Sequence, residues 1–427
     1  MIYLLVGILS LFITHNTMPQ VIINSPVVIS QSGNFTLGSD IIFDPLISNT
    51  AAFIITTSTV VFDLGGHFIS FNSSNTQHSI DAIYATTAMS NVTIQNGTIQ
   101  NFNGTGIHVA DACSGVKIYN CNITSCLTSG IWFDGSASGT GINLGQIQNC
   151  IVIKSTGANG GPAYGMRLVA TKNLASISNI FAFNDAGFTT SGYGIDLEFC
   201  SACQFLQNSC SFNGGIGEVA GFRIFNSTNC GFLGNVSNGN TCRDFSGTGT
   251  SAGYLSNQST GLFFDACRSL NNSTLSAANS AYGFLVKNGS KNFITDSLTE
   301  LTTGGGFAAG FGIVNESKTV VGTSASKETS TSITGTAVGI YLTLSTQCQV
   351  KTNQILNTSG ISGSFGVWDA SAVSSSFVID NTAINNVTNY NVTYGGGVVL
   401  PVQTGSLSSG GYPSGTFGIT DNISLNP

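Results

Sequence analysis

Residues 91–109 read NVTIQNGTIQNFNGTGIHV, and this stretch contains two short patterns that recur along most of the chain. The first is an aliphatic or Phe residue followed two positions later by Asn, Asp or Thr, as in Ile94 and Asn96. The second is a Gly that opens an apolar alternation, as in Gly106-Ile-His-Val. Each pattern repeats about every 29 residues, a period typical of proteins built from stacked units.

The first pattern forms a ladder of twelve positions separated by gaps of 24 to 33 residues. A unit of this size cannot bury its own apolar face, so neighbouring units must stack. By alternation the ladder residue points inward or lies at a corner, where stacked side chains hydrogen-bond from unit to unit. We interpret the ladder as structural. Its positions are Asp63, Asn96, Asn120, Asn149, Asn179, Asn208, Asn235, Asp265, Asp296, Thr323, Thr352 and Asp380.

Each unit contains the Gly-opened strand, the ladder strand and often a third short strand, with no helical pattern between them. This arrangement predicts an all-β fold, a single right-handed parallel β-helix of about 12 rungs with three parallel sheets. We expect the helix to span residues 61–393, with N-terminal cap strands in 21–60 and a C-terminal cap or tail in 394–427. The apolar run of residues 2–13 has the length of a signal-peptide core. Residues 1–20 are therefore expected to be a secretory signal or short anchor, with a buried first strand as the alternative.

The composition limits the classes of function. Only 7% of the residues are charged, the net charge is −7, and the 12 Lys and Arg residues form no basic stripe. Binding to nucleic acid through its phosphates is therefore not expected. Most of the 11 cysteines are interpreted as small core residues with free thiols. Cys200 and Cys203 form a lone CxxC, which gives no metal site.

The chain resembles the right-handed parallel β-helix superfamily of the pectate-lyase-like class, in particular its secreted and surface members. The resemblance rests on residues 91–109 and covers about three-quarters of the chain. The resemblance implies a parallel β-helix fold. It also implies that the usual partner is a polysaccharide held along one outer sheet. It does not fix an activity, because the same fold serves lyases, hydrolases, epimerases, tailspikes and adhesins.

The middle residue of the Gly-opened pattern is the outward one, and its successive copies should form a column on one sheet. That column reads His108, Trp132, Arg167, Asp196 and Arg223, then Leu285, Tyr341 and Trp368. Two residues farther along each strand, the same face has Asp134, Glu198 and Lys287.

Two interpretations of this column remain open. In the first, Trp132 stacks a sugar ring, His108 and Asp134 assist binding, the arginines bind carboxylates, and Asp196 with Glu198 supplies acid–base chemistry. Their carboxyl groups should then lie about 6–7 Å apart. In the second interpretation, the alternating charges form a salt-bridge ladder that covers an exposed sheet.

The sequence favours a glycan-binding surface protein, an adhesin or a fibre module without a catalytic site, with a polysaccharide lyase, hydrolase or epimerase as the alternative. The catalytic residues of that alternative would be Arg167, Asp196, Glu198 and Arg223. No cofactor is expected, since the two carboxylates make a poor calcium site. A homotrimer is the oligomer that a fibre role would suggest.

Overall fold

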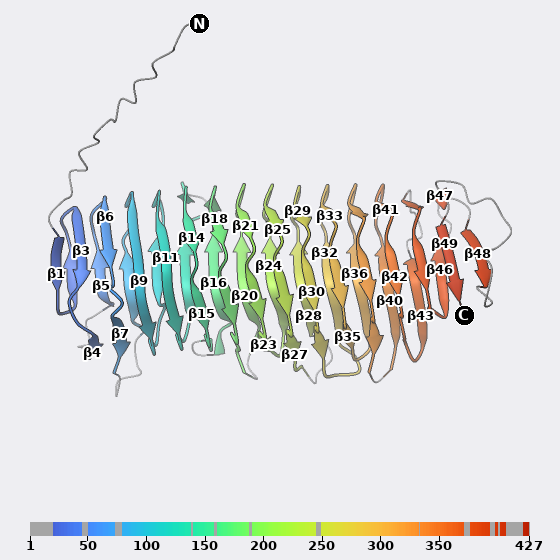
Figure 1. Cartoon of the computed structure of the whole chain (residues 1–427), viewed down its shortest axis with the longest axis horizontal. Helices are drawn as coiled ribbons and strands as arrows, with labels where there is room; N and C mark the ends of the chain where they lie inside the picture. Colours follow the sequence, from blue (N-terminus) through green and yellow to red (C-terminus); the bar gives the residue numbers. More distant parts are fainter. Residues whose placement is uncertain are drawn as a thin grey trace, which may run out of the picture.

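The computed structural model of the chain is a long rod of stacked β-strands (Figure 1). It describes residues 20–44, 50–72, 79–137, 140–157, 160–187, 190–244, 249–332, 334–370 and 376–391, and the backbone of 392, 398–399, 402–406 and 422–426. The expected signal or anchor therefore lies outside the described residues, apart from Gln20. So does most of the expected C-terminal cap or tail.

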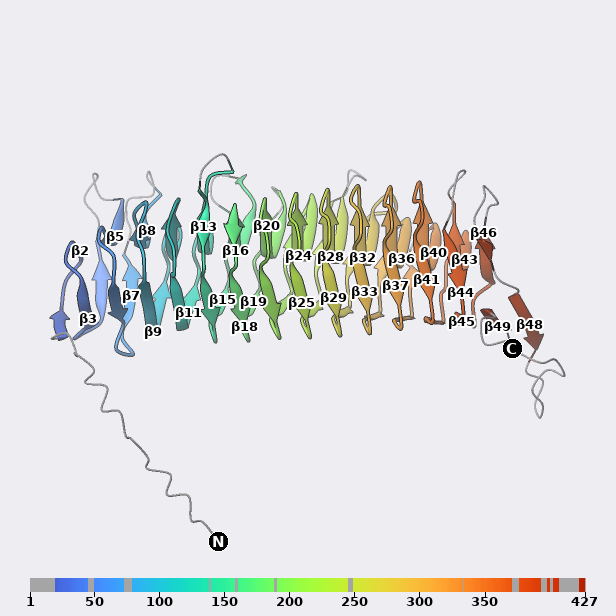
Figure 2. The same cartoon turned by 90° about the horizontal axis from the view of Figure 1, so that it is seen from above.

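The described strands form a parallel β-solenoid of about 11 turns of about 29 residues, with no α-helix among the described residues. The predicted parallel β-helix is confirmed by the strand pairing, which is parallel throughout. The two views show the strands lying side by side across the rod, with the first strands at one end and the last at the other (Figures 1 and 2). Strands β1 to β5, from the predicted cap region, already pair within these same sheets.

We call the 14-stranded sheet, which contains the Gly-opened strands, sheet 1. In order along the rod its strands are β2 (Val27–Ile29), β5 (Ala51–Ile55), β8 (Asp81–Ala85), β10 (Ile107–Ala110), β12 (Ser129–Asp134), β16 (Ala163–Val169), β20 (Gly192–Glu198), β24 (Glu218–Phe225), β28 (Thr250–Asn257), β32 (Ser280–Lys287), β36 (Phe307–Val314), β40 (Thr336–Thr343), β43 (Gly363–Asp369) and β46 (Thr388–Val392).

The other large sheet has two rows of strands, which are joined because β9 and β11 take part in both. Row 2a contains β1 (Gln20–Ile23), β3 (Gly33–Leu37), β6 (Val60–Asp63), β9 (Val92–Gln100), β11 (Lys117–Thr124), β14 (Gln146–Gln148), β18 (Ala175–Ile177), β21 (Gln204–Leu206), β25 (Gly231–Leu233), β29 (Phe263–Asp265), β33 (Phe293–Thr295), β37 (Val320–Gly322), β41 (Gln349–Lys351), β44 (Phe377–Ile379) and β47 (Val398–Val399).

Row 2b shares β9 and β11 and adds β4 (Ile41–Phe43), β7 (Phe68–Phe71), β15 (Ile151–Ile153), β19 (Ile180–Ala182), β22 (Ser209–Ser211), β26 (Val236–Asn238), β30 (Arg268–Leu270), β34 (Leu298–Glu300), β38 (Ala325–Lys327), β42 (Gln354–Leu356), β45 (Thr382–Ile384), β48 (Val402–Ser406) and β49 (Asn422–Asn426). Two small sheets lie at two other corners. Between sheet 1 and row 2a are β13 (Ile142–Asn143) and β17 (Thr171–Lys172), and between row 2b and sheet 1 are β23 (Gly214–Gly215), β27 (Thr241–Cys242), β31 (Ser273–Thr274), β35 (Thr303–Gly304) and β39 (Ser330–Thr331).

The core runs along the inside of the rod, where like residues stack from turn to turn. Phe205 and Phe232 lie face to face with ring centroids 5.0 Å apart, and Phe264 continues the stack at 4.8 Å. The Gly of the Gly-opened pattern faces this core. A Cβ at Gly130 would lie only 1.9 Å from Cγ1 of Val152. The pattern therefore requires Gly because the opposite row approaches too closely for any side chain.

The predicted ladder divides into different positions of the turn. Asn179, Asn208 and Asn235 are buried and stack, with Nδ2 of each of the first two donating to Oδ1 of the next at 3.0 and 3.1 Å. Asn120 and Asn149 instead are exposed at corners, in left-handed backbone with φ of 51° and 55°. Their side chains do not point inward because in those turns the left-handed corner falls on the ladder residue itself, whereas in the Asn179 turn it falls one residue before the ladder residue, at Ser178.

Asn96 belongs to the corner group as well. Its φ is 60°, it is half-buried, and its Oδ1 accepts a hydrogen bond from Nδ2 of Asn120 at 3.1 Å. Cys121 and Cys150 follow the corners at Asn120 and Asn149 and are buried. All 11 cysteines are buried with free thiols, which the sequence predicted for most of them. The small thiols and the inward amides thus occupy equivalent places in successive turns.

A second column of buried amides lies five residues beyond the first. Asn184, Asn213, Asn240 and Asn272 are buried, and Nδ2 of each of the first three donates to Oδ1 of the next at 3.1, 2.8 and 2.9 Å. These amides satisfy polar groups at a buried corner, where an unpaired donor would be costly. The solenoid is therefore stabilised by two amide columns.

Candidate functional site

The outer face of sheet 1 presents the column that the Gly-opened pattern predicted. Strand pairing aligns the predicted residues turn by turn and fills the gaps with Leu255 and Gly312. Tyr84 precedes the column on β8, one turn before His108. The full order is His108, Trp132, Arg167, Asp196, Arg223, Leu255, Leu285, Gly312, Tyr341 and Trp368.

The four proposed catalytic residues converge in one ion-pair network. Arg223 Nη1 donates to Asp196 Oδ1 at 2.6 Å and to Glu198 Oε1 at 3.2 Å, while its Nε donates to Glu218 Oε1 at 3.2 Å. Arg167 Nη2 donates to Glu198 Oε2 at 2.9 Å, and Arg167 Nε lies 3.7 Å from Asp196 Oδ2. Both guanidinium groups are thus engaged by carboxylates of the chain itself. This agrees with the interpretation of the column as a salt-bridge ladder and differs from the one in which the arginines bind carboxylates of a ligand.

The two central carboxylates have different environments. The Asp196 side chain is 0% exposed, and this burial raises its pKa to about 6, although the charge of Arg223 opposes the rise. Burial also acts to raise the pKa of Glu198, but the hydrogen bond and charge of Arg167, together with the charge of Arg223, outweigh it and lower that pKa. The environments therefore separate the two pKa values, as in many acid–base pairs.

The nearest oxygens of these two carboxylates lie closer together than the 6–7 Å expected between the groups. Asp196 Oδ1 and Glu198 Oε1 lie at 2.6 and 3.2 Å from the same nitrogen of Arg223, so the two oxygens are less than about 6 Å apart. The spacing falls below the expectation because the shared arginine draws both carboxylates together. That nitrogen also occupies the gap in which a glycosidic oxygen or a water molecule would have to lie.

Flat side chains stack along the first part of the column. The rings of His108 and Trp132 lie 4.6 Å apart and almost parallel, and the ring of Tyr84 lies 4.9 Å from His108. Cζ of Arg167 lies 5.6 Å from the Trp132 ring centre and 5.1 Å from that of Tyr164. Because His108 and Arg167 come from opposite neighbouring strands, both faces of the indole are covered. The expected stacking of a sugar on Trp132 is therefore not open, and the indole offers its edge.

His108 is held between two carboxylates. Its Nδ1 lies 2.8 Å from Oδ2 of Asp81, whose Oδ1 accepts a hydrogen bond from the backbone N–H of Thr105 at 2.7 Å. Its Nε2 lies 3.7 Å from Oδ2 of Asp134. The Asp134 side chain is 44% exposed, so it is the part of this cluster most accessible to a ligand.

Four polar atoms at successive positions of the column are buried and have no hydrogen-bond partner among the described residues. They are His108 Nε2, Trp132 Nε1, Arg167 Nε and Asp196 Oδ2. Buried polar atoms are normally paired, by protein or by ordered solvent, because an unpaired group costs about 1–3 kcal/mol. Three of the four have a charged neighbour just beyond hydrogen-bond distance: Arg167 Nε and Asp196 Oδ2 lie 3.7 Å from each other, and His108 Nε2 lies 3.7 Å from Asp134 Oδ2.

Sequence reasoning missed several members of the site. Strict alternation is interrupted after Tyr164 and Tyr193, because the Gly that follows each tyrosine and the residue after that Gly both face the core. The two tyrosine side chains therefore lie on the outer face. Arg223 packs over Tyr193 with Cζ 5.3 Å from the ring centre. Glu218 and Asp81 stand at the starts of β24 and β8, where only the strand bounds reveal that they belong to the same face. No spacing rule used above would have found them.

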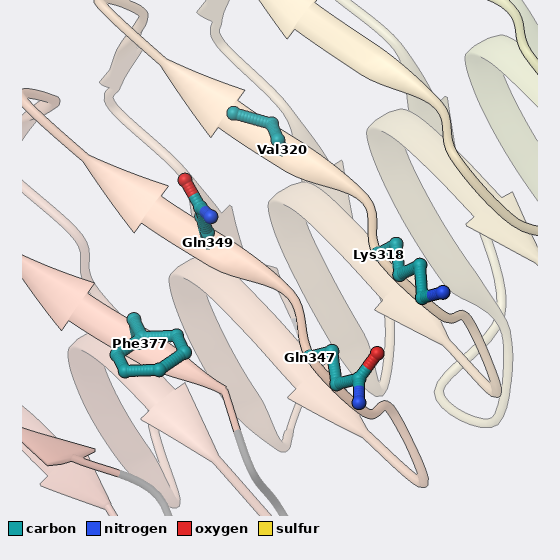
Figure 3. A pocket seen from close by; sticks show the side chains of 5 residues that line it. All are labelled: Lys318, Val320, Gln347, Gln349 and Phe377. Atoms are coloured by element: carbon teal, nitrogen blue, oxygen red, sulfur yellow. The ribbon is translucent and has the colours of Figure 1, made fainter.

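A separate hollow lies on the outer side of row 2a, far along the rod (Figure 3). Val320, Gln349 and Phe377 come from the paired strands β37, β41 and β44, and Lys318 and Gln347 from the turns before two of them. The described residues of the lining contribute amides, apolar groups and one amine, and no carboxylate or nucleophile is among them. Among the described residues, no group of three or more His, Cys, Asp or Glu could hold a metal ion.

No protein-family model and no curated protein sequence matches the chain. Among solved structures, the A-module of the mannuronan C-5 epimerase AlgE6 from Azotobacter vinelandii is 11% identical, with 90% of each chain covered and a TM-score of 0.41. DFA-IIIase from Arthrobacter chlorophenolicus A6, in complex with DFA-III, is 12% identical over 82% of this chain and 84% of its own, with a TM-score of 0.45. The Streptococcus pneumoniae surface adhesin PfbA is 11% identical over 88% and 83%, with a TM-score of 0.40.

These similar structures include both an epimerase and an adhesin, so they do not separate a catalytic role from a binding role. The fold itself is established by the strand pairing. In the part of the chain that the structure describes, no helix is long and apolar enough to cross a membrane.

Proposed function

We propose that the chain is a non-catalytic rod that binds a glycan along the outer face of sheet 1, between β8 and β32. The observation that carries this proposal is the outward column of stacked rings and partly exposed charged groups around Trp132, in which four polar atoms from His108 to Asp196 have no hydrogen-bond partner among the described residues. Hydroxyl groups both donate and accept, so a sugar can pair with the exposed groups of this face and, by displacing the side chains that cover it, with the Trp132 Nε1 donor. Successive turns are about 4.8 Å apart, which lets a linear polymer present repeated hydroxyls to repeated turns.

The accessible groups of this face suit hydrogen bonding to the edge of a polymer. Asp134, Glu218 and Arg167 retain 44%, 30% and 27% side-chain exposure. Their positions are fixed by ion pairs, so little side-chain freedom is lost when a ligand binds. The stacked rings of His108 and Trp132 give the face a rigid base.

Hydrolysis of a polysaccharide is a second candidate function, favoured by the separated pKa values of Asp196 and Glu198. The geometry opposes it, because Asp196 is fully buried and Arg223 Nη1 lies between the two carboxylates. A reducing-end assay over a polysaccharide panel separates the candidates. Activity that is lost in Asp196→Asn and Glu198→Gln would replace the binding proposal with the catalytic one.

Binding is tested on a panel of immobilised glycans, charged and uncharged, with the wild-type chain and two matched variants. Trp132→Phe keeps the ring in its stack but removes the Nε1 donor, whereas Trp368→Phe makes the same change at the far end of the same column. We expect saturable binding that weakens about tenfold in Trp132→Phe and is unchanged in Trp368→Phe. Absence of binding to every glycan would refute the proposal.

A further inference from the structure

The charges on the outer face of sheet 1 are unbalanced in a way that limits the ligand. The described face between β8 and β32 has three cations: Arg167, Arg223 and Lys287. Its five carboxylates are Asp81, Asp134, Asp196, Glu198 and Glu218. With His108 neutral, the negative charges of the face outnumber the positive charges by two.

None of the three cations lacks a carboxylate partner. Arg223 contacts three carboxylates within 3.2 Å, and Arg167 contacts Glu198 at 2.9 Å. Lys287 Nζ lies 3.6 Å from Glu218 Oε2, the same side chain that accepts from Arg223 Nε. A carboxylate or sulfate of a ligand would therefore have to displace an existing ion pair before it gained one.

The carboxylate with the most exposed side chain on this face also faces the proposed ligand. Asp134 has a 44% exposed side chain and lies beside His108, where the unpartnered atoms begin. A like charge brought against such a group is repelled, and misplaced like charges are a common means of excluding a wrong partner. A neutral hydroxyl, by contrast, can donate to the Asp134 carboxylate.

We infer that this face takes uncharged glycans and excludes acidic ones such as polyuronates and sulfated polymers. The inference rests on the proposed glycan-binding function and adds the charge class of the ligand. It follows from the self-paired arginines and the outward Asp134, and not from the number of acidic residues alone.

The test uses two polymer pairs that share a backbone and differ in charge: methyl-esterified and de-esterified homogalacturonan, and dextran and dextran sulfate. Binding of each polymer to the full chain is measured by affinity electrophoresis at low and moderate salt. We expect at least one uncharged member to bind at least about tenfold more tightly than its acidic partner. We also expect added salt to reduce this difference, because salt screens the repulsion between exposed charges.

Matched variants locate the effect. Asp134→Asn should improve binding of the acidic members by about threefold, whereas Asp265→Asn, the same charge change on the outer side of row 2a, should not. Tighter binding of an acidic member that is sensitive to Trp132→Phe would overturn the charge inference and leave the binding function intact. If no polymer of either charge binds, both the function and the inference are refuted.

Discussion

Arg223 Nη1 lies 2.6 Å from Oδ1 of Asp196, and this contact joins a fully buried carboxylate to an arginine that also contacts Glu198 and Glu218. The pair spans adjacent turns, β20 and β24, on the outer face of sheet 1. Arg223 additionally packs over the rings of Tyr193 and Phe225. The network is therefore already assembled before any ligand arrives.

Loss of Arg223 should be strongly destabilising. Arg223→Ala leaves the buried Asp196 without its nearest cation, which typically costs about 3–5 kcal/mol. The double variant Arg223→Ala/Asp196→Asn should recover much of that loss, because the uncompensated charge is gone. Arg268→Ala, at an exposed arginine of β30, serves as the control and should change stability by less than about 0.5 kcal/mol. Urea unfolding measures all three, and an equal loss in the single and double variants would contradict the account.

The free energy of unfolding should depend on pH, because the pKa of Asp196 is raised in the folded chain. Its pKa is about 6 in the folded chain against an ordinary value of 3.8, so the folded state holds the proton more tightly. The contribution of this group is fully present below about pH 4 and is lost as the pH rises through about 6. Relative to Asp196→Asn, the wild type should lose up to about 3 kcal/mol between pH 4 and pH 7. A difference that stays constant over this range would show that Asp196 titrates normally.

Because of the buried amide column, substituting two asparagines of the same ladder by Ala should lower the free energy of unfolding by very different amounts. Asn208 Oδ1 accepts from Asn179 Nδ2, and its Nδ2 donates to the Ser176 carbonyl at 2.9 Å and to Asn235 at 3.1 Å. Asn208→Ala leaves several of these groups unpaired and should cost about 2–4 kcal/mol. Asn149→Ala removes an exposed corner side chain and should cost less than about 1 kcal/mol, because only the preference of Asn for left-handed backbone is lost. Similar losses at both sites would argue against the amide column.

Exposed apolar residues in left-handed backbone offer a stabilising substitution. Leu344 has a φ of 51° and a 68% exposed side chain, so it bears backbone strain without burial in return. Leu344→Asn should raise stability by about 1 kcal/mol, since Asn tolerates this conformation. Val387, which is 78% exposed and lies outside the left-handed residues, is the control: Val387→Asn should give no gain. A gain at both positions would point to surface polarity instead of backbone strain.

The sequence patterns determined the fold because two independent markers shared one period, and they also placed His108 through Arg223 in one column in the correct order. What they could not supply is the position of each corner. A corner on the ladder residue places Asn149 outside, whereas a corner one residue earlier, at Ser178, lets Asn179 point inside, although both fit the same spacing. The second amide column had a readable signal, since Asn184 and Asn213 follow Asn179 and Asn208 by five residues.

The chemistry of the column depended on side-chain contacts that no period encodes. The sequence left open whether the arginines and the indole bind a ligand or whether the charges pair with one another in a salt-bridge ladder. In the structure Arg223 is shared by three carboxylates, and Trp132 is enclosed between His108 and Arg167. Glu218 and Tyr193, which complete these contacts, stand outside the alternation on which the prediction relied.

The most direct test of glycan binding at this face uses the only two tryptophans of the chain. Trp132 lies beside the unpartnered atoms and Trp368 lies at the far end of the same column, so each single-tryptophan variant reports on one end. Uncharged oligosaccharides are titrated into Trp368→Phe and Trp132→Phe while the tryptophan emission is recorded. The account predicts a saturable change in Trp368→Phe, where Trp132 remains, and none in Trp132→Phe. A saturable change only in Trp132→Phe, or none in either variant, would contradict it.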